Sequence, residues 1–106
     1  MKKNKNKIKF IDYQERLIES LKDPEEATAY LNVALEDEDP RIFLLALKNV
    51  IEAQFKISEI AKKTNLNREN LYRMLSKKGN PKLTSIVPLL QSIGLTLAVQ
   101  PFVVKK

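Results

Sequence analysis

The sequence predicts an all-α protein, a bundle of five or six short helices that contains a helix-turn-helix. Two observations favour helices: apolar residues recur every three or four positions through most of the chain, and two Asp-Pro pairs mark helix starts. A third observation limits strands to the two ends, because only there do β-prone residues gather. We therefore expect a short C-terminal strand and, as an option, a short N-terminal one.

The N-terminal segment, residues 1–11, carries five lysines and no acidic residue. Within it Ile8–Ile11 is apolar enough to form the short strand. Asp12 is expected to cap the first helix, with Glu15 at the spacing of a capping box. The inward stripe of this helix consists of apolar residues four positions apart: Tyr13, Leu17 and Leu21.

The two Asp-Pro pairs predict the next two helices. Asp23 can accept a hydrogen bond from the first turn, and Pro24 suits the first helical position because it has no N–H to leave unpaired. The buried stripe of this helix comprises Ala27, Tyr30, Leu31, Ala34 and Leu35. Asp39–Pro40 opens the following helix, in which Ile42–Ile51 is apolar on almost every side. Such a helix belongs at the centre of a small core.

A further helix is predicted over Leu83–Ile93, with Gly94 just past its end. Pro88 interrupts this helix and predicts a kink or a late start. Beyond it, Leu95–Val104 alternates and is rich in β-branched residues, so it is expected to be a strand, with Pro101 placing it at an edge.

Residues 57–75 predict two short helices around a tight turn. Asn65 suits the turn because it tolerates the left-handed conformation, Leu66 is expected to enter the core, and Asn67 is a good cap for the second helix. The inward-facing residues are Ile57, Ile60 and Ala61 in the first helix and Leu71, Met74 and Leu75 in the second.

The outward face of the second helix has the chemistry of DNA recognition. Arg68 can form hydrogen bonds to guanine, and Glu69 can accept a hydrogen bond from cytosine. Tyr72 and Arg73 extend the same face. The lysines that follow are expected to hold phosphates: Lys77, Lys78 and Lys82. A basic balance over Arg68–Lys82, with five bases and one acid, predicts double-stranded DNA as a partner.

Composition argues against other functions. There is no Cys and no His, and only two Gly, so Cys/His zinc sites, imidazole chemistry, activated nucleophiles and phosphate loops lack their residues. We therefore expect no enzyme activity, no cofactor and no metal. The lack of cysteines and of long apolar runs predicts a cytoplasmic protein rather than a membrane or secreted one.

Charge divides the chain into regions. Residues 12–39 hold ten acidic and two basic residues, whereas residues 40–106 hold twelve basic and three acidic ones. The predicted organisation is a basic segment (1–11), acidic helices (12–38), a DNA-binding domain (39–94) and a C-terminal strand or tail (95–106). The acidic region can meet a basic partner, or it can be a set of solvated helix faces.

Several ordered motifs resemble those of the putative addiction-module antidote proteins, which are HigA-like antitoxins with a Cro/phage-repressor type helix-turn-helix. The motifs are Ala29–Asp37, Asp39–Pro40, Ser58–Ala61, Leu66–Tyr72, Gly79–Pro81 and Ile93–Leu95. The resemblance spans about residues 12–100, and Pro88 departs from it. It implies that the DNA contacts include Arg68, Glu69, Tyr72 and Arg73, with Ser58 and Asn67 as lesser candidates.

The resemblance also implies a bacterial antitoxin that binds a RelE/HigB-type ribonuclease toxin and represses its own operon. Tyr13, Leu17 and Leu21 are then candidate toxin anchors; the alternative is that they pack on the protein's own core, which is favoured for Leu21. A phage-type repressor without a toxin partner is the alternative. We also expect a homodimer on a palindromic operator, joined by pairing of the C-terminal strands of two subunits. The alternative is that this strand pairs with Ile8–Ile11 of its own chain.

Overall fold

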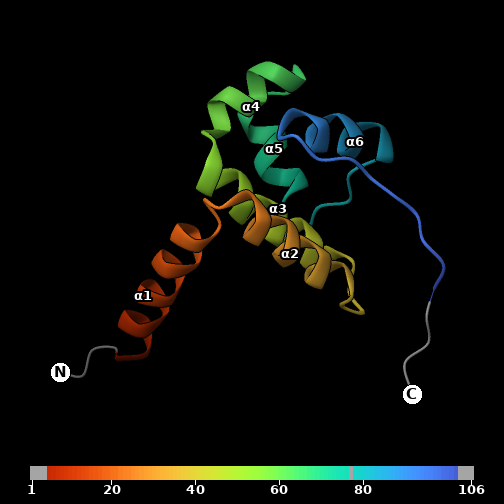
Figure 1. Ribbon diagram of the computed structural model, residues 1–106. Coiled ribbons are helices and arrows are strands. Elements are labelled where there is room, and N and C mark those ends of the chain that lie inside the picture. Colours follow the sequence, from red (N-terminus) through yellow and green to blue (C-terminus); the bar gives the residue numbers. More distant parts are fainter. Residues whose placement is uncertain (1–4, 77, 103–106) are drawn as a thin grey trace.

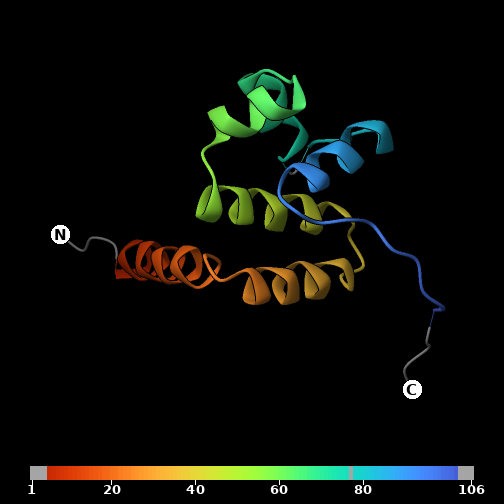
Figure 2. The same cartoon turned by 45° about the horizontal axis from the view of Figure 1, so that its top comes forward.

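The described residues form six helices, of which five make two layers on either side of a central one. The structure is a computed structural model that describes residues 5–76 and 78–102, and side chains from residue 12 onward. Its helices are α1 (Lys5–Ser20), α2 (Pro24–Leu35), α3 (Arg41–Gln54), α4 (Ile57–Thr64), α5 (Arg68–Met74) and α6 (Leu83–Ser92). α1 and α2 lie on one side of α3, and α4, α5 and α6 lie on the other (Figure 1, Figure 2). None of the helices described is both long and apolar enough to cross a bilayer.

The core is built on α3, as predicted for Ile42–Ile51. Its buried side chains are Phe43, Leu44, Ala46, Leu47, Val50 and Ile51. Every neighbouring helix on both sides adds to the same cluster, including Leu31 from α2, Ile60 from α4 and Leu89 from α6. The described chain therefore has one continuous hydrophobic core that both layers share.

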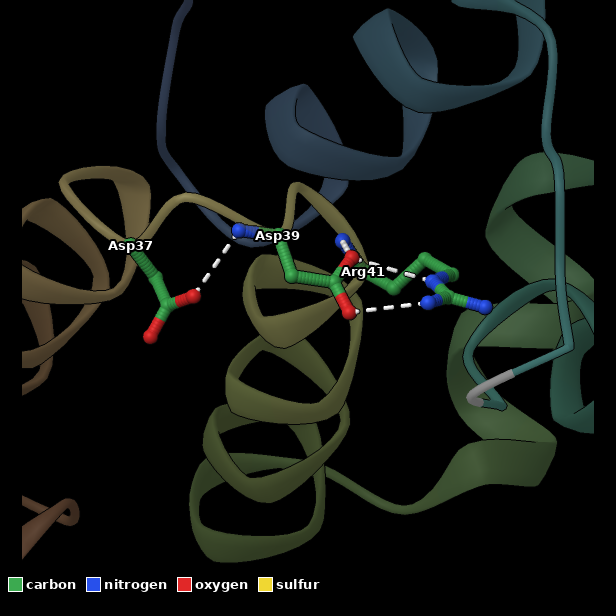
Figure 3. A network of polar contacts seen from close by, with 3 residues as sticks. All are labelled: Asp37, Asp39 and Arg41. Atoms are coloured by element: carbon green, nitrogen blue, oxygen red, sulfur yellow. Dashed lines mark hydrogen bonds and ion pairs between the residues drawn. The ribbon is translucent and has the colours of Figure 1, made fainter.

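Each Asp-Pro pair lies at a helix start, as predicted, although the cap of α3 is Pro40 rather than Asp39. The Asp23 carboxylate accepts the N–H of Glu25 at 2.9 Å, with Pro24 as the first residue of α2. Before α3, the Asp39 carboxylate accepts the N–H of Arg41 at 3.0 Å and its guanidinium at 2.9 and 3.0 Å (Figure 3). This hydrogen bonding, with the charge of Asp39, raises the pKa of Arg41. Asp37 in turn accepts the N–H of Asp39 at 2.8 Å, so the connection from α2 to α3 is held by a chain of carboxylates.

The end of α6 is a left-handed glycine, as predicted. Gly94 has a φ of 84°, its N–H donates to Gln91 at 3.1 Å, and the N–H of Leu95 donates to Leu90 at 2.9 Å. These two bonds form a Schellman motif, which satisfies carbonyls at the helix end. Pro88 lies inside α6 and is exposed. The helix nevertheless begins at Leu83, so the predicted late start is wrong.

The predicted N-terminal strand is wrong, because Ile8–Ile11 belongs to α1. No Pro or Gly lies between residues 5 and 20, so the helical pattern that follows can extend backward through this segment. Asp12 consequently lies inside the helix rather than at its start. Its carboxylate pairs instead with Arg16 one turn later, and this ion pair raises the pKa of Arg16.

The predicted C-terminal strand is also not seen. Residues 95–102 are extended without strand pairing and run away from the helices (Figure 1), and residues 103–104 of the predicted strand lie outside the described residues. A strand needs a partner for its backbone groups, and the partner proposed within the same chain is helical. Apolar side chains of this tail are therefore exposed: Leu97, Val99 and Phe102.

The three residues of the predicted apolar stripe in the first helix differ in how far they are buried. Leu21 is 1% exposed and belongs to the core, Leu17 is half-buried, and Tyr13 is 64% exposed. Among the described side chains of this segment, those near its C-terminal end thus reach the core, whereas Tyr13 offers apolar surface to solvent.

Candidate nucleic-acid interface

The turn between α4 and α5 has the conformation that its residues predict. Asn65 adopts the left-handed region, with φ 60° and ψ 30°, and the N–H of Leu66 donates back to Ala61 at 3.0 Å. The side-chain oxygen of Asn67 then accepts the N–H of Asn70 at 2.7 Å, which caps the start of α5. These contacts fix the direction of α5 relative to α4 without any help from a ligand.

Burial of α5 on one side determines which residues face outward. Leu71 and Leu75 are fully buried in the same core cluster as Ile60 of α4, and Met74 and Leu66 pack partly against this cluster. The predicted inward positions of both helices are confirmed by this packing. The remaining positions of α5 are left at the surface.

All the predicted contact residues that the structure describes are exposed. Arg68 and Glu69 form the first turn of α5, Arg73 lies in its last turn, and Tyr72 is 39% exposed between them. The exposed residues of the flanking segments are Ser58, Asn67, Lys78 and Lys82. Lys77 lies outside the described residues.

The basic residues of this face are not neutralised by neighbouring acids. In the described part of the chain, the ion pairs are Asp12–Arg16, Glu19–Lys22 and Asp39–Arg41. None of these ion pairs involves Arg68, Arg73, Lys78 or Lys82. Their charges are therefore available to an anion from outside.

Lys48 is a member of this face that sequence reasoning missed. It lies on α3, 24 positions before Tyr72, yet its ammonium nitrogen is 5.7 Å from the centre of the Tyr72 ring. No sequence signal distinguishes it from any other half-exposed lysine of a helix. The fold alone adds this positive charge to the outer face of α5.

Gly79 holds the lysine-containing loop against the end of α5. A Cβ at this position would lie 2.3 Å from the carbonyl oxygen of Met74 and 2.6 Å from that of Arg73, distances that no side chain can occupy. The N–H of Gly79 donates to Ser76 at 2.9 Å. The close approach keeps Lys78 beside the C-terminal end of α5.

The site has no evident metal-binding group. Among the described residues, no three acidic side chains gather closely enough to hold an ion. What the arrangement offers is a fixed, exposed helix face with two arginines, a glutamate and a tyrosine, surrounded by lysines. Such a face can bind an anionic polymer and contact it through hydrogen-bonding side chains.

Comparison with known proteins places most of the helical region in one family. A model of the family described as "probable addiction module antidote protein" matches residues 11–101. A Haemophilus influenzae protein, described as uncharacterized, is 33% identical over 82 residues, which are 77% of this chain and 84% of that relative. No solved structure matches the chain significantly. The chain belongs to the family of probable addiction module antidote proteins.

Proposed function

We propose that this protein is the antitoxin of a toxin–antitoxin module, that it binds double-stranded DNA through the outer face of α5, and that it represses its own operon. Membership of an antidote family implies a toxin partner of some kind. The observation that carries the DNA-binding part is the exposed face of α5, where Arg68 and Arg73 have no ion pair in the described structure.

The proposed roles follow from position on α5. Arg68 and Glu69, in its first turn, read base edges in the major groove, as recognition helices do with their N-terminal residues. Arg73, Lys78, Lys82 and Lys48 hold phosphates around the helix and set its register. Asn67 plays a smaller part, because its side-chain oxygen already caps the helix.

The proposed partner is a toxin of the RelE/HigB type, an expectation that comes from the family resemblance. The protein acts by binding and not by catalysis, since its sequence lacks the imidazole and thiol groups that activate nucleophiles. It binds a palindromic operator as a homodimer, because one short recognition helix covers only a few base pairs. The exposed apolar tail, residues 95–102, is the surface we assign to that dimer.

The experiment compares two arginine variants on the DNA upstream of the protein's own gene. Arg68→Ala is expected to weaken binding by about 1–3 kcal/mol, measured by fluorescence anisotropy. Arg16→Ala removes the same charge from an exposed helix of the other layer and should leave affinity nearly unchanged. Equal effects of the two variants, or no binding by the unaltered protein, would refute the assignment of α5.

A further inference from the structure

A shallow apolar groove lies on the opposite side of α3 from the candidate DNA-binding face. It consists of a hollow of about 470 Å³ between α1 and α2 and a hollow of about 590 Å³ between α1, α2 and α3. The hollows share Leu17, Tyr30 and Val33 in their linings, so they form one continuous surface. Figure 2 shows α1 and α2 together on this side of α3.

The groove exposes apolar side chains to solvent. Val33, in the last turn of α2, is 66% exposed, and Tyr13 on α1 is 64% exposed. Leu17 and Tyr30 are half-buried between them, on a floor that includes the buried Ala34. A contiguous apolar patch that is rimmed by polar residues is typical of a binding surface.

A chain of polar side chains fixes the shape of this groove. The side-chain amide of Gln14 on α1 donates to Asn49 on α3 at 3.2 Å, and the amide of Asn49 donates to the hydroxyl of Tyr30 on α2 at 2.9 Å. All three helices that form the groove are joined in this way. The groove thus exists before anything binds, which reduces the ordering that binding requires.

The rim of the groove is acidic. Glu25 and Glu26 line one hollow, and Glu36 and Asp37 line the other. In the described structure none of these four carboxylates forms an ion pair, whereas Asp12 and Glu19 on the nearby α1 do. Complementary charge selects binding partners, so an occupant of this groove must carry bases on both sides of an apolar ridge.

The lining also indicates the conformation of the occupant. The groove is formed almost entirely by helices, whose backbone groups bond within each helix, so an added strand finds no edge to pair with. An amphipathic helix instead needs only an apolar groove for side chains at helical spacing.

We propose that this groove docks a basic amphipathic helix of the toxin, with apolar side chains against Leu17, Tyr30 and Val33 and flanking Lys or Arg residues against the acidic rim. The inference rests on the proposed antitoxin function and assigns a surface to it. Because α5 lies across α3 from the groove, an occupied groove leaves the candidate DNA-binding face open.

The test uses two lysine substitutions at equally exposed apolar positions. Val33→Lys places a positive charge within the groove, and Leu83→Lys does so at the start of α6, where the exposed fraction is 65% against 66% for Val33. The probe is the purified protein encoded by the reading frame adjacent to this gene, titrated against the full chain. Val33→Lys should weaken the complex by about tenfold or more, and Leu83→Lys by less than about twofold.

A double variant provides an independent measurement. Glu25→Gln with Glu26→Gln keeps the shape of the rim and removes two charges, so the complex should weaken and become less sensitive to salt. This variant also covers the case in which Val33→Lys does not fold, although lysine at an exposed helix position is a better helix former than valine. Circular dichroism and anisotropy on the upstream DNA verify that each variant is folded and still binds DNA.

The outcomes separate the docking site from the function. If the unaltered chain binds the neighbouring protein and the groove variants bind it equally well, the groove is not the site and the antitoxin function stands. If the unaltered chain binds DNA but not the neighbouring protein, the antitoxin function fails and the docking site with it. If Val33→Lys converts a dimer to a monomer in light scattering, the occupant is a second copy and the proposal is overturned.

Discussion

The ammonium group of Lys48 lies over the ring of Tyr72, 5.7 Å from its centre, and so links α3 to α5. An ammonium in this position is attracted by the negative face of the ring. Tyr72 is therefore not a free side chain on the surface of α5. It orients Lys48 on the outer face of α5, and both residues belong to the fold as well as to the site.

This contact predicts a measurable coupling. Lys48→Met should lower the free energy of unfolding by about 0.5–1 kcal/mol, because the attraction at an exposed site has that size. In urea denaturation, the same substitution in a Tyr72→Leu background should have a clearly smaller effect. Strictly additive effects of the two substitutions would show that the contact contributes nothing to stability.

The lysines after α5 should affect affinity without affecting specificity. Lys78→Ala and Lys82→Ala are each expected to reduce the slope of log affinity against log salt by about one, because each phosphate contact releases a counterion. In anisotropy titrations, both substitutions should weaken binding to operator DNA and binding to unrelated DNA to the same extent. A change confined to the operator would instead make either lysine a base-reading residue.

Substitution of either glycine by alanine should lower the stability of the protein, but for different reasons. Gly79→Ala places a methyl group onto the backbone carbonyls of α5, which must move, so we expect a loss of several kcal/mol in stability and weaker DNA binding. Gly94→Ala meets no atom within 4 Å and is strained only by its φ of 84°, so its loss should be about 1–2 kcal/mol. Thermal unfolding measures both, and a milder effect at Gly79 would contradict the close approach.

The turn before α5 offers another pair of substitutions. Asn67→Ala removes the side-chain oxygen that accepts the N–H of Asn70, and it should cost about 0.5–2 kcal/mol in urea denaturation. Asn65→Gly keeps the left-handed conformation available and should leave stability within about 0.5 kcal/mol of the unaltered protein. A large loss at Asn65→Gly would mean that the asparagine side chain itself holds the turn.

Removal of the tail tests its part in assembly. A chain that ends after Thr96 keeps Leu95, which packs against the core, and loses the exposed Leu97, Val99 and Phe102. We expect it to keep its helices and to lose dimerisation, and with it operator affinity, as measured by light scattering and anisotropy. A truncated protein that is as dimeric as the full chain would move the dimer contact to another surface.

Local signals predicted most of the helices correctly. Asp23–Pro24 and Asp39–Pro40 mark helix starts through carboxylates and a missing N–H, Asn65 and Gly94 mark left-handed positions, and Ile42–Ile51 marks the centre by its apolarity. Each of these depends on residues close together in the chain. The assignment of exposed residues on α5 followed from the same periodicity, because Leu71 and Leu75 determine which face is buried.

The failures concern features that depend on distant residues. Ile8–Ile11 and the tail both have β-prone residues, but a strand requires a partner, and periodicity does not show whether one is present. The Lys48–Tyr72 contact and the Gln14–Asn49–Tyr30 chain join residues on different helices, so neither has a local signature. The acidic composition of residues 12–39 indicated a partner, whereas the groove itself appears only when α1, α2 and α3 are assembled.

The position of α3 between the two layers has a thermodynamic consequence. Leu47 and Ile51 are completely buried in a core that both layers share, so neither layer can melt without opening the hydrophobic face of the other. We therefore expect the helices to unfold in a single cooperative transition. By linkage, any molecule that binds the native protein on one side also protects the opposite side from unfolding. The chain is then most vulnerable to unfolding when both sides are empty, and its lifetime becomes a measure of how much binding partner is present.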